Sequence, residues 1–225
     1  RIDIKNIKKS YSKNEVLRNV SFSLESGECV GILGGNGCGK STLIKLISGL
    51  LQADSGEIFV YGKPVGEESK SLVSYLPERP YFTPSMKVTD LLDYFQDFYV
   101  DFDRDRAMKL LQDLAINPDA RMKTLSKGTK EKVQLILVMS RNAKLYLLDE
   151  PIAGVDPIAV QDIQDIVWHL KDKNIGILIT DHNVDETLSI TDRAYLLFEG
   201  KILFQGTPKE LADNPVVREK YLGRD

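Results

Sequence analysis

Gly34-Gly35-Asn36-Gly37-Cys38-Gly39-Lys40-Ser41-Thr42 is the stretch of this chain that decides its fold. It fits the pattern G-x-x-x-x-G-K-[ST], whose glycines allow successive backbone N–H groups to point at one anion. Lys40 brings a mobile positive charge to the β- and γ-phosphates of a nucleotide, and Ser41 offers Mg²⁺ the oxygen ligand that this ion prefers. A following helix would add its positive end to the same phosphates. The stretch therefore predicts a phosphate-binding loop.

The residues on either side of this loop fit that prediction. Residues 29–33 are a short apolar run typical of a buried strand. After the loop, apolar residues recur at helical spacing, at Leu43, Ile44, Leu46, Ile47 and Leu50. Because strand, glycine loop and helix follow one another, a phosphate-binding loop explains the stretch better than an ordinary glycine turn capped by a lysine.

The composition narrows the class of protein. A chain of 225 residues suits one large domain or two interleaved subdomains, and a net charge of −3 has no electrostatic footprint for nucleic acid. The two cysteines, Cys29 and Cys38, lie in the expected strand and loop, so we expect reduced thiols and a cytoplasmic setting. No apolar run approaches the roughly 20 residues that a membrane helix needs.

The first third of the chain predicts strands. Residues 1–24 are interpreted as two strands joined by a polar loop that contains Tyr11. Residues 56–61 and 71–76 are two further candidates, and the prolines of Pro77-Glu78-Arg79-Pro80 mark a boundary after them. The composition then turns helical.

The middle of the chain predicts helices. Thr89 and Asp103 are predicted to cap two of them, residues 124–130 form a polar loop, and residues 131–140 form a third helix. We interpret residues 83–140 as an α-helical subdomain of a single nucleotide-binding domain that spans residues 1–225. The core of that domain is then formed by residues 1–80 and 144–225.

The last third alternates again between strands and helices. Apolar runs end in Asp149-Glu150 and in Asp181-His182, as buried parallel strands would. Asp156-Pro157 and Thr207 are predicted to begin helices, and residues 194–205 to form a hairpin. Strands that alternate with helices predict an α/β fold.

The acidic pair at the end of one strand indicates which reaction the nucleotide site could catalyse. Asp149 is placed to hold Mg²⁺, and Glu150 is free to take a proton from an attacking water. A solvated acid at the end of a strand is the plainer alternative for Glu150. The pair and the glycine loop together favour nucleotide hydrolysis.

A third motif, Leu125-Ser126-Lys127-Gly128-Thr129, lies between the other two. With all three, the chain resembles the ATPase subunit of ATP-binding cassette (ABC) transporters over essentially its whole length. The resemblance implies a P-loop NTPase (RecA-like) core, an N-terminal antiparallel β-subdomain and the inserted helical subdomain. It also implies ATP and Mg²⁺ as ligands.

The resemblance also implies roles for residues of this chain. Tyr11, which alone would be interpreted as a surface tyrosine, is similar to the aromatic residue that stacks on adenine. Glu78 stands where the family has a glutamine that touches Mg²⁺ and water, and His182 matches the histidine that contacts the γ-phosphate. The residues expected to contact ATP are Tyr11, Gly35, Asn36, Gly37, Cys38, Gly39, Lys40, Ser41, Thr42, Leu125, Ser126 and Gly128. Those expected at Mg²⁺ are Ser41, Glu78 and Asp149, and the catalytic pair is Glu150 and His182.

Partners follow from the same resemblance. Two subunits, either two copies or a paired ABC subunit, dimerise head to tail, so that each ATP lies between one phosphate loop and the partner's Leu125–Thr129 motif. Opening and closing of that dimer drives an integral-membrane permease. The chain is therefore expected on the inner face of the cell membrane, without a nucleic-acid partner. Three residues depart from the family pattern, namely Glu78, Lys127 and Thr129, and we expect an active but variant ATPase.

Two closer resemblances divide the chain. The N-terminal two-thirds is similar to bacterial ABC-2-type exporter ATPases, and the C-terminal third, from about Asp162 through Tyr221-Leu222-Gly223, to the lipopolysaccharide-export ATPase. A natural protein that blends the two and an engineered fusion joined near residues 150 to 165 both fit. The alternatives to a transporter subunit are a soluble ABC ATPase and a chimeric cassette that binds ATP without a transport partner.

Overall fold

Two β-sheets organise the computed structural model, which describes residues 1–79, 82–171 and 174–222. The first sheet is antiparallel, with the strand order β2-β1-β4-β5. Its strands are β1 (Ile2–Tyr11), β2 (Asn14–Leu24), β4 (Ser55–Val60) and β5 (Lys63–Pro64). Apolar residues alternate along β1 and β2 because one face of this sheet packs on the core while the other is exposed. The predicted N-terminal antiparallel β-structure is confirmed.

The second sheet has six strands in the order β10-β9-β3-β8-β7-β6. They are β3 (Cys29–Leu33), β6 (Val73–Leu76), β7 (Leu145–Asp149), β8 (Gly176–Asp181), β9 (Arg193–Phe198) and β10 (Lys201–Gly206). All neighbours pair in parallel except β10, which adds to the edge as the second strand of the predicted hairpin. Strands β3, β7 and β8 are buried on both faces, which explains their continuous apolar sequences.

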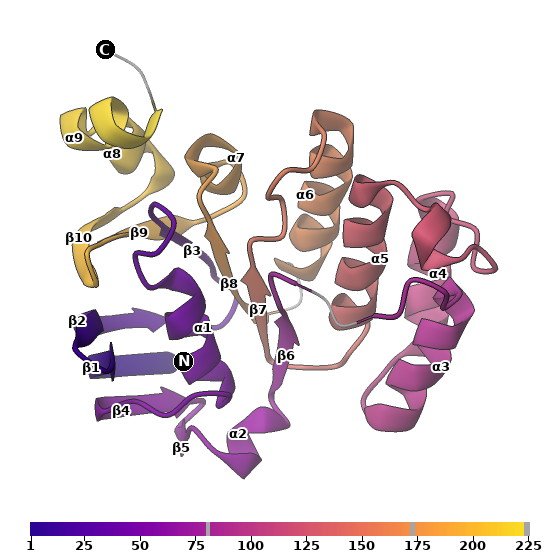
Figure 1. Ribbon diagram of the computed structural model, residues 1–225, viewed down its shortest axis with the longest axis horizontal. Coiled ribbons are helices and arrows are strands. Elements are labelled where there is room, and N and C mark those ends of the chain that lie inside the picture. Colours follow the sequence, from indigo (N-terminus) through magenta and orange to yellow (C-terminus); the bar gives the residue numbers. More distant parts are fainter. Residues whose placement is uncertain (80–81, 172–173, 223–225) are drawn as a thin grey trace.

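Helices cover both faces of the six-stranded sheet (Figure 1). Helix α1 (Lys40–Ser48) lies between the two sheets, where it shares a core with Leu145 and Leu147 of β7. Helices α5 (Lys127–Met139) and α6 (Pro157–Lys171) cover the opposite face and share a core with Tyr146 and Leu148. The alternation of side chains along β7 therefore joins these two cores.

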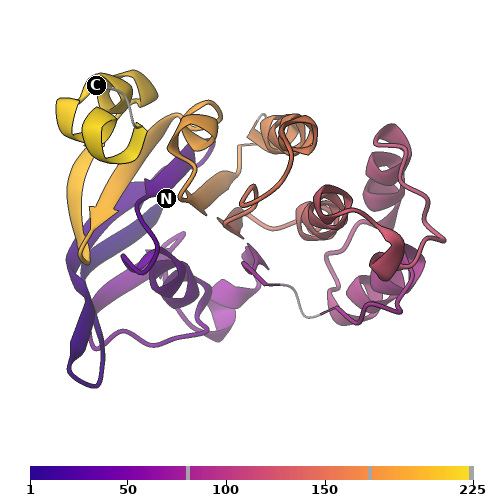
Figure 2. The same ribbon diagram turned by 45° about the horizontal axis from the view of Figure 1, so that its top comes forward.

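Helices α3 (Val88–Phe98) and α4 (Arg104–Asp113) lie beyond α5, on the side away from the antiparallel sheet (Figure 2). The short elements are α2 (Glu67–Lys70), η1 (Met122–Thr124), α7 (Val184–Leu188), α8 (Pro208–Asp213), α9 (Pro215–Val217) and η2 (Arg218–Leu222). In the ranges that the structure describes, no helix has both the length and the apolar character that crossing a membrane requires.

Three local predictions need correction. Helix α3 begins one residue before Thr89 and has Lys87 at its N-cap, where the Asp90 carboxylate accepts the Lys87 backbone N–H. The expected polar loop at residues 124–130 is helical from Lys127 onward, because Ser126 caps α5. Leu50 lies beyond the end of α1 and is exposed, since Gly49 in a left-handed conformation ends that helix.

Other local predictions are confirmed. Asp103 caps α4 by accepting the Arg106 N–H, and Thr207 and Glu210 form the predicted capping box of α8. Asp156 caps α6 by accepting the backbone N–H groups of Ile158 and Ala159. The predicted boundary at Pro80 and the resemblance at Gly223 fall outside the described residues.

Candidate nucleotide-binding and hydrolysis site

The phosphate loop joins β3 to α1, and neighbouring segments of the chain pack closely against its glycines. Gly39 has a φ of +109°, and a Cβ added there would lie 2.8 Å from Leu17 Cδ2. At Gly34 an added Cβ would overlap the Leu197 carbonyl oxygen. The two glycines of the pattern are therefore required by conformation and by space, as the motif predicts.

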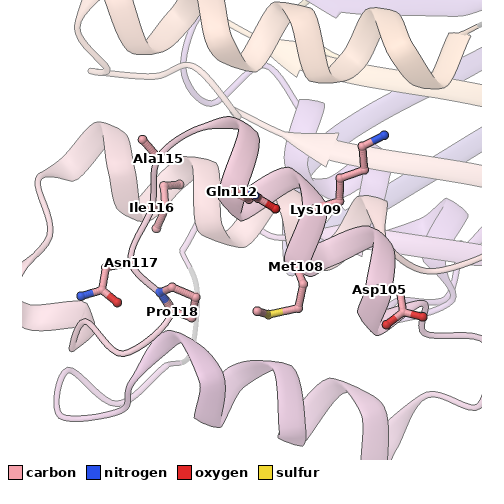
Figure 3. A pocket seen from close by; sticks show the side chains of 8 residues that line it. All are labelled: Asp105, Met108, Lys109, Gln112, Ala115, Ile116, Asn117 and Pro118. Atoms are coloured by element: carbon pink, nitrogen blue, oxygen red, sulfur yellow. The ribbon is translucent and has the colours of Figure 1, made fainter.

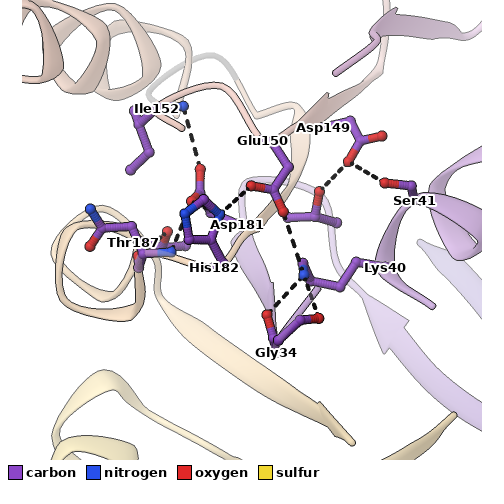
Figure 4. A network of polar contacts seen from close by, with 12 residues as sticks. Gly34, Lys40, Ser41, Asp149, Glu150, Ile152, Asp181, His182 and Thr187 are labelled. Atoms are coloured by element: carbon purple, nitrogen blue, oxygen red, sulfur yellow. Dashed lines mark hydrogen bonds and ion pairs between the residues drawn. The ribbon is translucent and has the colours of Figure 1, made fainter. Parts of the chain in front are cut away.

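Lys40 lies at the centre of the loop and is almost completely buried. Its Nζ donates to the carbonyl oxygens of Gly34, at 2.8 Å, and Gly35, at 3.1 Å (Figure 4). Nζ also lies 3.4 Å from Glu150 Oε1. A hollow of about 430 Å³ opens beside it, lined by Val16, Asn36, Gly37, Gly39, Lys40, Ser41, Thr42, Glu78 and Glu150. A buried cation in a glycine loop, beside a hollow of this size, fits the triphosphate of a nucleotide.

Asp149 ends β7 next to the loop. Its Oδ1 accepts hydrogen bonds from Ser41 Oγ at 3.1 Å and from Thr180 Oγ1 at 2.7 Å. Burial raises the pKa of the Asp149 carboxyl, while these two hydrogen bonds lower it. Ser41 and Asp149 thus bring the oxygen donors that suit Mg²⁺ to one point, and the exposed Glu78 lines the same hollow. This donor set fits the predicted magnesium site.

Glu150 lies between Lys40 and His182 and has a strained backbone. Its φ is +52°, in the left-handed region that costs a non-glycine residue roughly 1–3 kcal/mol. The Glu150 N–H donates to the Thr180 carbonyl at 2.9 Å, which fixes this turn against β8. One carboxylate oxygen lies near Lys40, and the other is 2.6 Å from Nδ1 of His182. The side chain of Glu150 is therefore held at the mouth of the phosphate loop.

Asp181 lies beside Glu150 and His182, and it is not among the site residues predicted from the sequence. It ends β8, is completely buried, and accepts the backbone N–H groups of Asn183 at 2.9 Å and Ile152 at 3.4 Å. Burial raises the pKa of its carboxyl to about 6. Its position at the end of a parallel strand, directly before His182, is the signal that identifies it, because such strand ends meet at one edge of the sheet.

The Leu125–Thr129 motif lies at the start of α5, and Leu125 packs half-buried against the core. The exposed Ser126 accepts the Thr129 backbone N–H at 3.1 Å and caps the helix. Gly128 is buried so tightly against the start of α6 that an added Cβ would lie 2.7 Å from the Cβ of Ala159. Within the part of the chain that the structure describes, no hydrogen bond or ion pair joins this motif to the phosphate loop.

Two predicted nucleotide contacts lie at the margin of the site. Tyr11 is the last residue of β1, is 46% exposed, and has Lys9 Nζ 5.6 Å from its ring centroid. It does not line the hollow beside Lys40, whereas Val16, which the sequence analysis did not select, does. Cys38 is half-buried, and burial raises the pKa of its thiol against the opposing effect of Lys40.

A second hollow, of about 670 Å³, lies between α4 and the loop that follows it (Figure 3). Met108, Asn117 and Pro118 are among its lining residues, and none of the predicted site residues is. The chemistry predicted from the motifs therefore gathers at the phosphate loop and not at this hollow.

Comparison with known proteins agrees with this site. The family described as "ABC transporter" matches residues 17–153. The chain is 38% identical to the lipopolysaccharide export system ATP-binding protein LptB of Acidithiobacillus ferridurans, over 96% of this chain and 93% of the relative. It is 37% identical to LptB of Escherichia coli K12, over 98% and 96%. Among solved structures, the ADP conformation of MJ1267, an ATP-binding cassette of an ABC transporter, has a TM-score of 0.84 and 30% identity, covering 99% of this chain and 98% of that one.

These similarities extend along the whole chain. The alignments to LptB include the N-terminal two-thirds as well as the C-terminal third. The separate resemblance to ABC-2-type exporters and the fusion near residues 150 to 165 are not confirmed by them and stay predictions. The predicted P-loop NTPase fold is confirmed by the solved cassettes. The chain belongs to the ATP-hydrolysing ABC transporter family.

Proposed function

We propose that two copies of this chain close head to tail around two ATP molecules and power a membrane permease that exports its substrate. One observation carries the proposal: Ser126 and residues 35–37 of the phosphate loop are exposed, and among the residues that the structure describes no hydrogen bond joins them. The free end of α5 at Ser126 adds positive N–H groups that suit a phosphate. A second chain would bring that end to this chain's loop.

Each residue of the site has a chemical task in this proposal. Lys40 and the loop N–H groups bind the phosphates, and Ser41, Asp149 and Glu78 would hold Mg²⁺. Mg²⁺ held there would supply positive charge to offset the charge that develops on the transferred phosphoryl group. Glu150 accepts the proton of the attacking water, and His182 orients Glu150 and reaches toward the terminal phosphate. Tyr11 stays a proposed contact of the adenine base.

Docking of the permease is proposed at a groove beside the helical subdomain, residues 83–140. A hollow of about 430 Å³ lies there, lined by Leu50, Tyr75, Leu76, Pro77, Phe82, Thr83, Met86, Tyr94, Phe95, Tyr99, Gln134 and Val138. Tyr94 is half exposed and stacks on Phe98, whose centroid is 5.7 Å away. Aromatic side chains with one exposed face suit a partner helix. The export direction is supported by the names of the LptB relatives.

Recovery of a permease with the tagged chain tests this function. We expect a permease to copurify from membranes with the wild-type chain, and Tyr94→Ala to reduce recovery about fivefold or more, as loss of a central aromatic contact does. Trp168→Ala is the matched control, because Trp168 is 47% exposed, like Tyr94 at 50%, but lies on α6. Recovery of no permease by the wild-type chain would favour a soluble ABC ATPase. Equal recovery by both variants would exclude the groove as the docking surface.

Exchange with a relative tests which permease fits. Since 37% identity to E. coli LptB leaves nearly two-thirds of aligned residues different, we expect a mismatched docking groove, which costs affinity through clashes and unpaired polar groups. The chain should therefore not restore growth to E. coli depleted of LptB, whereas plasmid-borne LptB should. Growth rescue by this chain at matched expression would show that the two grooves are interchangeable.

A further inference from the structure

Three metal-ligating side chains converge at the ends of β7 and β8, beside the predicted magnesium site. His182 Nδ1 lies 2.6 Å from Glu150 Oε2 and 3.7 Å from Asp181 Oδ1. One ligand atom from each of the three residues lies within 4.8 Å of the others. Figure 4 shows the three side chains near one another, with a Glu150 carboxylate oxygen against the His182 ring. The cluster follows from topology, because β7 and β8 are adjacent parallel strands whose ends meet.

The spacing is close to that of a tetrahedral zinc site. Zn–N and Zn–O bonds of about 2.0–2.2 Å place ligand atoms about 3.3–3.5 Å apart. The His182–Glu150 distance has to widen and the His182–Asp181 distance to shorten by less than about 1 Å, and the ligand atoms of Glu150 and Asp181, which lie within 4.8 Å, have to close by at most about 1.5 Å. His182 is 47% exposed and can move by that amount, whereas Asp181 is buried and stays fixed. The rearrangement thus needs a small shift of the exposed His182 ring and of the Glu150 carboxylate.

Asp181 is held in place independently of any cation. Its Oδ1 accepts the Asn183 N–H and its Oδ2 accepts the Ile152 N–H. Each carboxylate oxygen has two lone pairs, so Oδ1 keeps this hydrogen bond and still has a lone pair for a metal. The carboxylate is therefore oriented before a ligand arrives, which is the function of outer hydrogen bonds at metal sites.

Charge in the cluster also favours a cation. Two carboxylates share the site with one imidazole, and Lys40 offers Glu150 an ion pair at 3.4 Å. Asp181 is completely buried, and the hydrogen bonds that it accepts from two neutral backbone N–H groups leave its charge without full compensation. A divalent cation would supply that compensation.

We propose that Glu150, Asp181 and His182 form a Zn²⁺ site that is separate from the magnesium site and that inhibits hydrolysis when filled. The imidazole nitrogen and two carboxylate oxygens suit zinc, whereas Mg²⁺ prefers an all-oxygen octahedron. Zn²⁺ replaces the proton shared by His182 Nδ1 and Glu150, and that proton leaves to water. Bound zinc withdraws the lone pairs of Glu150 from the attacking water. The inhibition rests on the function proposed above, but metal binding does not.

Titration of the nucleotide-free chain with Co²⁺ tests the site, because tetrahedral Co²⁺ reports binding by its visible absorption. We expect one Co²⁺ per chain, displaced by Zn²⁺ and not by Mg²⁺. His182→Ala should weaken binding by roughly 10- to 100-fold, the loss typical even of residues that only orient metal ligands. Asp181→Asn, which keeps the shape of the side chain, should weaken binding similarly. His169→Ala is the matched control, since His169 and His182 are the two histidines of the chain.

Variants at other residues distinguish metal binding at this site from metal binding elsewhere on the chain. Unchanged Co²⁺ binding in His182→Ala, or its loss in His169→Ala, would overturn the proposal. Cys38→Ser should retain the Co²⁺ spectrum, and loss of binding there would assign the metal to the thiolate instead. With free Zn²⁺ buffered and MgATP in excess, wild-type and His169→Ala turnover should both fall. Hydrolysis unaffected by zinc in a chain that binds it would contradict the inhibitory role alone.

Discussion

Replacing Glu150 with glutamine is expected to lower ATP turnover by roughly 10²–10⁴-fold, the contribution of a positioned general base. The amide has nearly the same shape, so it keeps a contact with His182, but it cannot accept a proton from water. ATP binding should remain, because Lys40 and the loop glycines are untouched. With ATP bound and not hydrolysed, the variant should accumulate as a dimer. Turnover and ATP-dependent dimer formation, measured by phosphate release and size-exclusion chromatography, check both expectations.

The matched control for this variant is Glu199→Gln. Glu199 is also a glutamate with a left-handed backbone, at a φ of +46° compared with +52° at Glu150. It is exposed in the turn between β9 and β10 and does not line the hollow beside Lys40, so turnover should stay at the wild-type level. Wild-type turnover in Glu150→Gln would remove Glu150 from the proposed mechanism. Loss of turnover in both variants would indicate a structural effect of the substitution.

Much of the fold is predictable because helices and strands with a buried face have apolar residues at regular spacing in the sequence. The strand predicted at residues 29–33 has the observed bounds of β3, since every residue in it is buried. The start of α5 is harder to predict from the sequence, because residues 124–130 are polar and have no apolar repeat. The side chain of Ser126 and the close packing of Gly128 on α6 make that segment helical, and both depend on tertiary contacts.

The candidate site was predictable where a motif fixes its spacing. The phosphate loop, Lys40 and the acidic pair follow from residues close together in the sequence. Asp181 was missed because its proximity to Glu150 depends on β8 lying beside β7, and chain order does not specify that neighbour. The left-handed backbone conformation of Glu150 cannot be predicted from the sequence either, since glutamate has no intrinsic preference for that conformation.

Ser126→Arg is expected to abolish ATP-driven dimerisation while monomer ATP binding stays nearly intact. Ser126 is exposed at the start of α5, and within the described part of its own chain it has no hydrogen bond to the phosphate loop. A long cationic side chain there would occupy the space that the partner's terminal phosphate needs. Turnover should fall together with dimerisation, because each site requires both chains.

Two measurements separate this effect from damage to the helix. Loss of the Ser126 cap costs about 1 kcal/mol, so thermal unfolding should shift only modestly. Ser71→Arg is the matched control, because Ser71 is also exposed but follows α2, and it should dimerise normally. Equilibrium binding of a fluorescent ATP analogue to the monomer then decides the case. If Ser126→Arg loses that binding while remaining folded, Ser126 serves the nucleotide of its own chain, and the head-to-tail arrangement is wrong.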